Sequence, residues 1–419
     1  MNSYSEKMLD ALRNEDLAKA QEMFQAALKN DSAEILASLA QELQNLGFLT
    51  EAREIITQLL EEFPEEDYFY LSLAEMAIED DEIDQAFEYL EKIPMDSPNY
   101  LESLLVTADL YQVLGIPEVS EAKLLQAKAI APEETLITFA LGELHFANNQ
   151  LGEAIAEYGQ LQKQGINEVA NISLNERIGS GYSLLGGFEE AIPFLKAAID
   201  EESTSDRLFQ LGFTYYQLKE YQQAIIYFEE VQKMDPEYQS VYYYLADSLK
   251  EEELVEEALK IAEAGIKENP YQVETLHLAS ELAYRLHNRE KSEDYLDQAL
   301  STGEKVDETL LTLSNLFLNE GEPEEAIQAI SKMDEQDNPY ALWNLAQAND
   351  ELEEYAEAGK YYQLAYEELK QEAEFLKAYG LFLREEGQLA QARQVLADYL
   401  ALEPEDIEVQ SILQDLLER

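Results

Sequence analysis

The chain has 419 residues, enough for two or three globular domains, and it carries 88 Asp and Glu against 28 Lys and Arg. The resulting formal charge of −60 excludes a surface made to bind nucleic acid or anionic lipid, because both would be repelled. A hydrophobic content of 46%, with 26 Tyr and 15 Phe, argues against disorder, and the absence of cysteine excludes disulfides and thiolate chemistry.

The N-terminal segment, MNSYSEKMLDALRNEDLAKA, has no apolar run preceded by positive charge, so it does not have the pattern of a secretory signal. No stretch of the sequence approaches the roughly 18 consecutive apolar residues that a membrane helix needs. We therefore expect a cytoplasmic protein that does not insert into a membrane.

A short pattern recurs from residue 20 onward: a small residue, a large apolar residue four positions later, and another apolar residue three positions after that. Residues 221–238, YQQAIIYFEEVQKMDPEY, contain the clearest copy. The successive steps are 32, 34, 34, 34, 37, 33, 34, 34, 34, 32 and 34 residues. The small residue lies at Ala20, Ala52, Ala86, Ser120, Ala154, Ala191, Ala224, Ala258, Ser292, Ala326, Ala358 and Ala392. Proline follows twelve positions later at Pro64, Pro98, Pro132, Pro236, Pro270 and Pro404.

A second small residue lies twelve positions before the first one and is flanked by Leu or an aromatic residue. The best copy is Leu211-Gly212-x-x-Tyr215, and close copies begin at Leu141, Ile178 and Tyr379. Together the two halves resemble the tetratricopeptide signature L-G-x2-Y…A-x3-F…P, over nearly the whole chain. The resemblance implies an all-α, right-handed superhelical solenoid of about twelve helical hairpins that binds other proteins. The chain is similar to the all-repeat, acidic, cytoplasmic tetratricopeptide proteins of Gram-positive bacteria.

The residue types have a physical reason, since two antiparallel helices approach closely only where side chains are small. We expect the small residues of the two helices to meet, with the large residue at the +4 position beside that contact. Proline ends the second helix, because the residue before proline disfavours the α region.

The longest step, from Ala154 to Ala191, contains the helix-stopping residues Gly165 and Asn167. It predicts a boundary near residue 166 between an array of about five repeats in residues 1–165 and one of about seven in residues 166–405. A single continuous solenoid with a longer loop is the alternative. In the ninth repeat, Leu278-Ala279 lies one residue early relative to Ser292.

Residues 406–419 fit a final amphipathic helix that caps the last repeat, since Ile407, Ile412, Leu413, Leu416 and Leu417 share one face. The first repeat is degenerate, as terminal repeats often are.

No pattern in the sequence predicts catalysis or a cofactor. The three histidines form no metal-binding pair, and His145 takes the Tyr position of the signature, which predicts a packed core histidine. His277 and His287 lie ten residues apart in one repeat. The sequence has no phosphate-binding loop and no G-x-S-x-G elbow, and EDDEID at residues 79–84 lacks the Gly and terminal Glu of a calcium loop. We predict no catalytic residues, no metal site and no cofactor.

The resemblance implies a binding groove lined by the first helix of each hairpin. Carried over by position, the groove residues form an aromatic set with interleaved carboxylates: Phe139, Glu143, Phe146, Phe209, Phe213, Tyr216, Tyr243, Asp247, Glu281, Tyr284 and Trp343. Ala147, His277 and Gln347 take equivalent positions. Aromatic anchors beside carboxylates favour a ligand with Lys or Arg and apolar side chains. The alternative is that some of these rings pack between repeats. A clamp for a C-terminal carboxylate is disfavoured, because tetratricopeptide domains of that kind use Lys, Arg and Asn at these positions.

These patterns indicate an adaptor or scaffold that binds a basic, apolar-anchored segment of a partner protein. The alternative is an acidic regulator, or nucleic-acid mimic, that sequesters a basic nucleic-acid-binding protein. An enzyme would need a cofactor for which the sequence has no site. We expect a monomer because of the charge of −60, with dimerisation through an apolar end repeat as the alternative.

Overall fold

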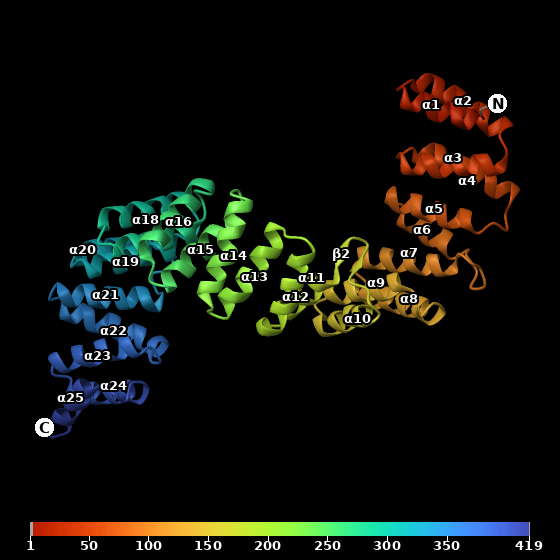
Figure 1. The fold of residues 1–419 in the computed structure, drawn as a ribbon. Helices are drawn as coiled ribbons and strands as arrows, with labels where there is room; N and C mark the ends of the chain where they lie inside the picture. Colours follow the sequence, from red (N-terminus) through yellow and green to blue (C-terminus); the bar gives the residue numbers. More distant parts are fainter. Residues whose placement is uncertain (1–2, 419) are drawn as a thin grey trace. The chain divides into compact units, whose positions relative to one another are not determined.

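The computed structural model describes residues 3–418, and the chain divides into two compact units, Met1–Glu202 and Ser203–Arg419. The first unit holds α1 (Tyr4–Arg13), α2 (Leu17–Asn30), α3 (Ala33–Asn45), α4 (Leu49–Glu62), α5 (Tyr68–Glu79), α6 (Ile83–Leu90), α7 (Tyr100–Val113), α8 (Pro117–Ile130), α9 (Thr135–Ala147), α10 (Leu151–Lys163), β1 (Glu168–Val169), β2 (Ile172–Ser173), α11 (Leu174–Leu184) and α12 (Phe188–Glu201) (Figure 1).

In the part of the chain that the structure describes, the regular secondary structure of the second unit is entirely helical. Its helices are α13 (Ser205–Gln217), α14 (Tyr221–Met234), α15 (Gln239–Glu251), α16 (Val255–Glu268), α17 (Val273–Arg285), α18 (Arg289–Thr302), α19 (Val306–Asn319), α20 (Pro323–Ile330), α21 (Pro339–Glu351), α22 (Tyr355–Leu369), α23 (Ala373–Glu385), α24 (Leu389–Leu402) and α25 (Ile407–Glu418).

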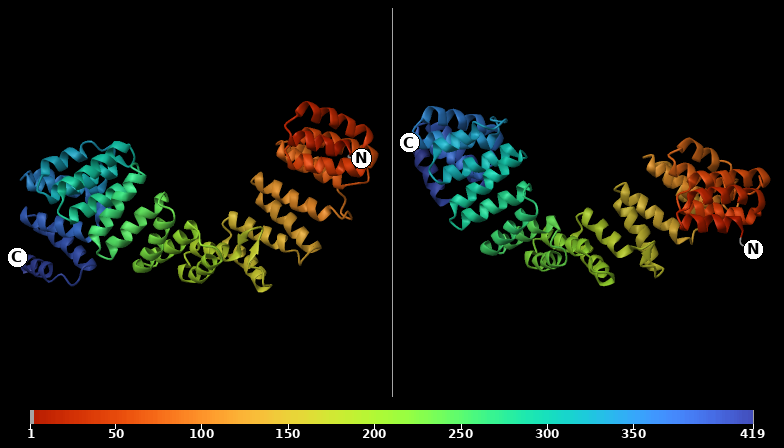
Figure 2. Two further views of the ribbon diagram at one scale, coloured as in Figure 1. Left: turned by 45° about the horizontal axis from the view of Figure 1, so that its top comes forward. Right: turned by 90° about the horizontal axis from the view of Figure 1, so that it is seen from above.

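Each odd-numbered helix up to α23 packs against the helix that follows it, which makes twelve hairpins. Within each unit the two helices of a hairpin lie side by side in every view (Figures 1 and 2). The twelve small residues of the sequence pattern lie one on each second helix, and all are at most 3% exposed. The predicted fold class is therefore confirmed: all-α, with twelve hairpins and a C-terminal helix. No helix within residues 3–418 is long and apolar enough to cross a bilayer.

In hairpins whose first helix has a glycine at the small position, the closest contact differs from the prediction. A Cβ placed on Gly142 of α9 would lie 2.5 Å from the Tyr158 ring of α10, and one on Gly212 of α13 would lie 2.8 Å from the Phe228 ring of α14. The nearest neighbour of each glycine is thus the large residue at the +4 position, not the small residue of the second helix. Glycine in the first helix leaves room for the large side chain of the second helix to lie over the backbone of the first.

The long step near residue 166 contains a β-hairpin, in which β1 pairs antiparallel with β2. Its two turn residues, Ala170 and Asn171, have φ of 50° and 62°, the left-handed conformation that a tight hairpin turn requires. Val169 is buried, and β1 contacts α9. The division between the compact units comes later, at Glu202 and Ser203. The division into arrays of residues 1–165 and 166–405 stays a prediction.

The ninth hairpin keeps its register through a polar contact. Ser280 of α17 lies twelve residues before Ser292 of α18, and the two buried hydroxyls are 2.8 Å apart. The predicted one-residue offset at Leu278-Ala279 is therefore wrong, because a serine takes the small position at which the pattern led us to expect Gly or Ala.

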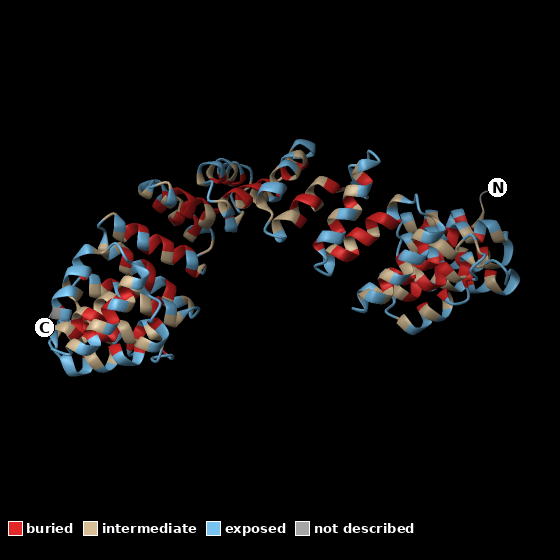
Figure 3. Cartoon of the chain, turned by 90° about the horizontal axis from the view of Figure 1, so that it is seen from below, coloured by how far each residue is buried: buried red, intermediate tan, exposed pale blue. Residues whose placement is uncertain are grey.

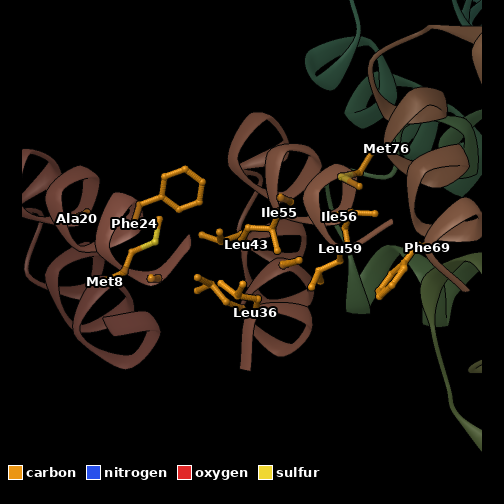
Figure 4. Packing of buried hydrophobic residues seen from close by; sticks show 14 of the residues in the cluster. Met8, Ala20, Phe24, Leu36, Leu43, Ile55, Ile56, Leu59, Phe69 and Met76 are labelled. Atoms are coloured by element: carbon orange, nitrogen blue, oxygen red, sulfur yellow. The ribbon is translucent and has the colours of Figure 1, made fainter. Parts of the chain in front are cut away.

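Buried residues lie mainly where helices face one another (Figure 3). In the first three hairpins Phe24, Leu43 and Ile55 belong to one continuous apolar core (Figure 4). At the other end of the chain, Val409 and Leu416 of α25 join the core of the last hairpins.

Asp406 fixes the start of α25. Its carboxylate accepts hydrogen bonds from the Val409 backbone N–H at 3.0 Å, from Lys377 Nζ at 2.8 Å and from Tyr399 Oη at 2.7 Å. The Lys377 hydrogen bond, the largest cause, and these other donors hold the pKa of Asp406 well below its usual range.

Candidate functional site

A cavity of about 530 Å³ lies on the face made by the first helices of the tenth and eleventh hairpins. Four of its residues come from α19 and five from α21. Three on each helix are four positions apart and so lie on one helical face: Leu311, Asn315 and Asn319 of α19, and Trp343, Gln347 and Glu351 of α21. We call it the Trp343 cavity. Its lining residues are Leu311, Asn315, Leu318, Asn319, Tyr340, Trp343, Asn344, Gln347, Glu351 and Glu374.

The first unit has a cavity of about 380 Å³ that is lined from equivalent positions of its repeats. It lies between α7 and α9, again the first helices of consecutive hairpins. Asp109 and Glu143, which line it, both directly follow the small residue of their helix. Ala170 of the β-hairpin also lines this cavity.

Of the predicted groove residues in the first unit, Phe139 is only 8% exposed. Its ring centroid lies 6.2 Å from that of Tyr158, and it shares a core with Val169 of the β-hairpin. The β-hairpin therefore helps to bury a ring that we expected to be exposed.

Glu143 and Phe146 are held by Arg177 from the next hairpin. The Arg177 guanidinium donates two hydrogen bonds to the Glu143 carboxylate, at 2.9 and 2.8 Å, and lies 5.4 Å from the centre of the Phe146 ring. Tyr158 Oη donates to the same carboxylate at 2.6 Å. Burial, followed by this hydrogen bond, raises the pKa of Tyr158. The charge of Glu143 is thus balanced within the chain.

In the second unit, Phe209, Phe213, Tyr216 and Tyr243 lie together as one aromatic cluster of α13 and α15. Its central ring is Tyr244, which lies 5.1 Å from Phe213, 5.3 Å from Tyr216 and 5.3 Å from Tyr243. All five side chains are half-buried, so these rings pack between repeats while keeping one side exposed. The sequence reasoning missed Tyr244, which is one position away from the groove register.

Asp247 lies at the edge of the aromatic cluster and is only 8% exposed. It accepts a hydrogen bond from Tyr216 Oη at 2.6 Å and pairs with Lys250 Nζ at 2.8 Å. Burial alone would lower the pKa of Lys250, but the hydrogen bond and charge of Asp247 outweigh it and raise that pKa. Glu281 is 3.6 Å from the same Lys250 Nζ. As with Glu143, the negative charge here is balanced by a basic side chain of the same chain.

The remaining predicted residues are separate from this cluster. Tyr284 Oη donates to Glu320 at 2.9 Å. Trp343 lies in its own cavity, held edge to face against Phe375 with ring centroids 5.7 Å apart and an angle of 89°. His145 is buried, which confirms the prediction of a packed core histidine. His277 Nε2 lies 2.8 Å from Thr309 Oγ1.

Eight of the ten residues that line the Trp343 cavity were missed, among them Tyr340, Asn344, Glu351 and Glu374. Trp343 and Gln347 are four positions apart, and another step of four reaches Glu351, so the spacing in the sequence could have pointed to that residue. Glu374 comes from a different helix, α23, and no local pattern points to it.

A chain built of hairpins with a period of about 34 residues and a buried small residue in each second helix is a tetratricopeptide-repeat protein. Residues 205–238 match the family described as "Tetratricopeptide repeat". Such repeats mediate protein–protein interaction, and proteins built from them are typically scaffolds rather than enzymes.

Residues 339–406 match "YpiA-like, C-terminal tetratricopeptide repeats" and residues 112–166 match "YpiA-like, tetratricopeptide repeats". Residues 5–113 match "Tetratricopeptide repeat protein 21 ARM repeat". The chain is 33% identical over 368 residues to TPR repeat-containing protein YpiA of Bacillus subtilis (strain 168), covering 87% of each protein. The chain belongs to the YpiA-like family of tetratricopeptide-repeat proteins.

Further similarity is more distant. The chain is 29% identical over 188 residues to intraflagellar transport protein 70B of Mus musculus, covering 42% of this chain and 28% of that protein. Among solved structures, yeast Tom70 is 14% identical with a TM-score of 0.46, covering 99% of this chain and 94% of that one. YrrB, described as a TPR protein with an unusual peptide-binding site, is 20% identical with a TM-score of 0.39, covering 45% and 95%.

Proposed function

We propose that this protein is a cytoplasmic, non-enzymatic adaptor or scaffold that binds a basic, apolar-anchored segment of a partner protein along its first helices. The observation that carries the proposal is the register of the two cavities. In each unit a cavity is lined by the same helical face of two consecutive hairpins. A groove of that kind suits an extended segment, which can place successive side chains against successive repeats.

The charge of the chain supports the basic character of the ligand. An excess of 60 acidic charges raises the local concentration of cationic segments and speeds their association. The half-buried rings from Phe209 to Tyr244 supply apolar contact surface beside this negative field.

The same charge favours the second candidate, an acidic protein that sequesters a basic nucleic-acid-binding protein. Salt distinguishes the two, because binding through many ion pairs weakens steeply as salt rises while apolar anchoring does not. A sequestering protein would also bind without any requirement for apolar residues in its partner.

A peptide array tests the proposal. Twelve-residue peptides that combine Lys or Arg with Leu or Phe are probed with the full-length protein, beside versions in which the apolar residues become Ser. We expect the apolar-containing peptides to bind and to stay bound at about 300 mM NaCl, well beyond the salt at which exposed charges are screened. Equal binding of both sets, lost at that salt, would favour the sequestering candidate, and no binding would refute the groove.

A substitution that fills the groove locates the binding face. Gln347→Arg places a long side chain at the Trp343 cavity without removing a core residue. Gln328→Arg makes the same change at an exposed position of α20 that does not line the cavity. Binding should fall with Gln347→Arg and persist with Gln328→Arg, and equal binding by both variants would place the ligand elsewhere.

A further inference from the structure

Within the described residues, the Trp343 cavity has two carboxylates without an ion pair, which distinguishes them from Glu143 and Asp247 of the predicted groove. Among residues 3–418, neither Glu351 nor Glu374 has an ion pair within 4.0 Å, and both are exposed. By contrast, Glu143 is paired with Arg177 and Asp247 with Lys250. The Trp343 cavity is therefore a groove site whose negative charge the chain leaves unbalanced.

A buried amide adds a third acceptor to this cavity. Asn344 is 4% exposed and uses its Nδ2 group to donate to Ser314 Oγ at 3.2 Å and to Asn315 Oδ1 at 2.7 Å. These two bonds fix the orientation of the amide. Both bonds use Nδ2, and within residues 3–418 no hydrogen bond to the Oδ1 atom is found, so this lining residue leaves an acceptor for a ligand.

Two aromatic rings complete the cavity wall. Tyr340 is 43% exposed, and Trp343 is fixed by its edge-to-face contact with Phe375. Trp343 Nε1 is buried and has no hydrogen-bond partner in the described part of the chain. A cation is attracted to the face of such rings, most strongly to that of tryptophan.

Carboxyl groups at and next to the cavity raise one another's pKa. Partial desolvation beside the cavity, followed by the charge of Asp350, raises the pKa of Glu351. Burial, followed by the charges of Glu385 and Glu386, raises the pKa of Asp350. These carboxylates destabilise one another's charged forms, and a bound cation would relieve that repulsion.

We propose that the Trp343 cavity is a binding site for one lysine or arginine side chain of the partner segment. Glu351, Glu374 and Asn344 Oδ1 accept its hydrogen bonds, and the rings of Tyr340 and Trp343 contact its aliphatic stem and charged head. Both side chains are donors only, which matches a wall whose free polar groups include three acceptors. This inference rests on the proposed function and names the side chain that the groove selects.

Tryptophan fluorescence tests the site directly, because Trp343 is the only tryptophan of the chain. The probe is a blocked nine-residue peptide with one central lysine between two leucines, and the matched control peptide has norleucine in place of lysine. The full-length protein should show a saturable fluorescence change with the lysine peptide and bind the norleucine peptide at least tenfold more weakly. Absence of a change with the lysine peptide, or equal affinity for both peptides, would overturn the proposal.

Charge-matched variants separate the site from the general field. Glu351→Gln combined with Glu374→Gln should weaken binding of the lysine peptide about tenfold, whereas Glu405→Gln with Glu408→Gln, which removes as much charge outside the cavity, should change it less than twofold. An equal loss in both double variants would overturn the site. If array peptides bind while the fluorescence stays unchanged, the cavity assignment fails and the proposed function stands. If no array peptide binds, the proposed function itself fails.

Discussion

The contact between Gly212 and Phe228 shows how single residues set the spacing of these hairpins. The ring of Phe228 is fully buried and lies over the backbone of α13 at the glycine. The same relation holds between Gly142 and Tyr158. A residue pair sixteen positions apart in the sequence thus sets the packing of one hairpin, and its recurrence sets that of the other hairpins that have this glycine.

Gly212→Ala should lower the free energy of unfolding by about 1–3 kcal/mol, since its Cβ would lie 2.8 Å from a ring that has no room to move. Gly159→Ala is the matched control, because nothing lies within 4 Å of a Cβ at that helical position. It should stabilise the protein by about 0.5–1 kcal/mol through higher helix propensity. Urea denaturation followed by circular dichroism measures both, and destabilisation by Gly159→Ala would contradict the steric account.

At the scale of elements, the β-hairpin adds to the wall of the cavity in the first unit. It fills the extra length of the step from Ala154 to Ala191, and its Val169 shares a core with Phe139. Its turn places Ala170 beside the cavity in a left-handed conformation, where a Cβ is unfavourable.

Ala170→Gly should therefore raise the free energy of unfolding by up to about 1 kcal/mol, because it removes a strained Cβ. The melting temperature measures this effect. Ala140→Gly, within α9, is the control and should lower stability by about 0.5–1 kcal/mol, since glycine weakens a helix interior. If Ala170→Gly also lowered the melting temperature, the turn would not be strained.

At the scale of the whole molecule, charge is the dominant feature. A net charge of −60 opposes association between copies of the chain and also opposes the folded state, because folding brings the charges closer together. Exposed ion pairs such as Lys360 with Glu357 are each worth little against this repulsion.

Raising NaCl from about 20 to about 300 mM should increase the melting temperature, because screening shortens the range of the repulsion from about 20 Å to less than 8 Å. Differential scanning calorimetry measures the shift, with a neutral osmolyte of matched osmolarity as the control. A melting temperature that fell with salt would show that the ion pairs outweigh the repulsion.

The sequence by itself determined the hairpins and their number. A pattern with a period of about 34 residues is local, and a small residue twelve positions before another can be recognised without coordinates. It also pointed to Trp343 and, through the same spacing of four, to Glu351.

Only the tertiary structure decided which side chains of the predicted groove already have a partner within the chain. Arg177 lies 34 residues from the Glu143 that it neutralises, and Tyr244 faces α13 from the next hairpin. The cavity around Trp343 likewise unites α19, α21 and α23. Contacts between successive repeats depend on how hairpins stack. A periodic sequence fixes the stacking face of each hairpin, but the side chains that meet across it are set by packing in three dimensions.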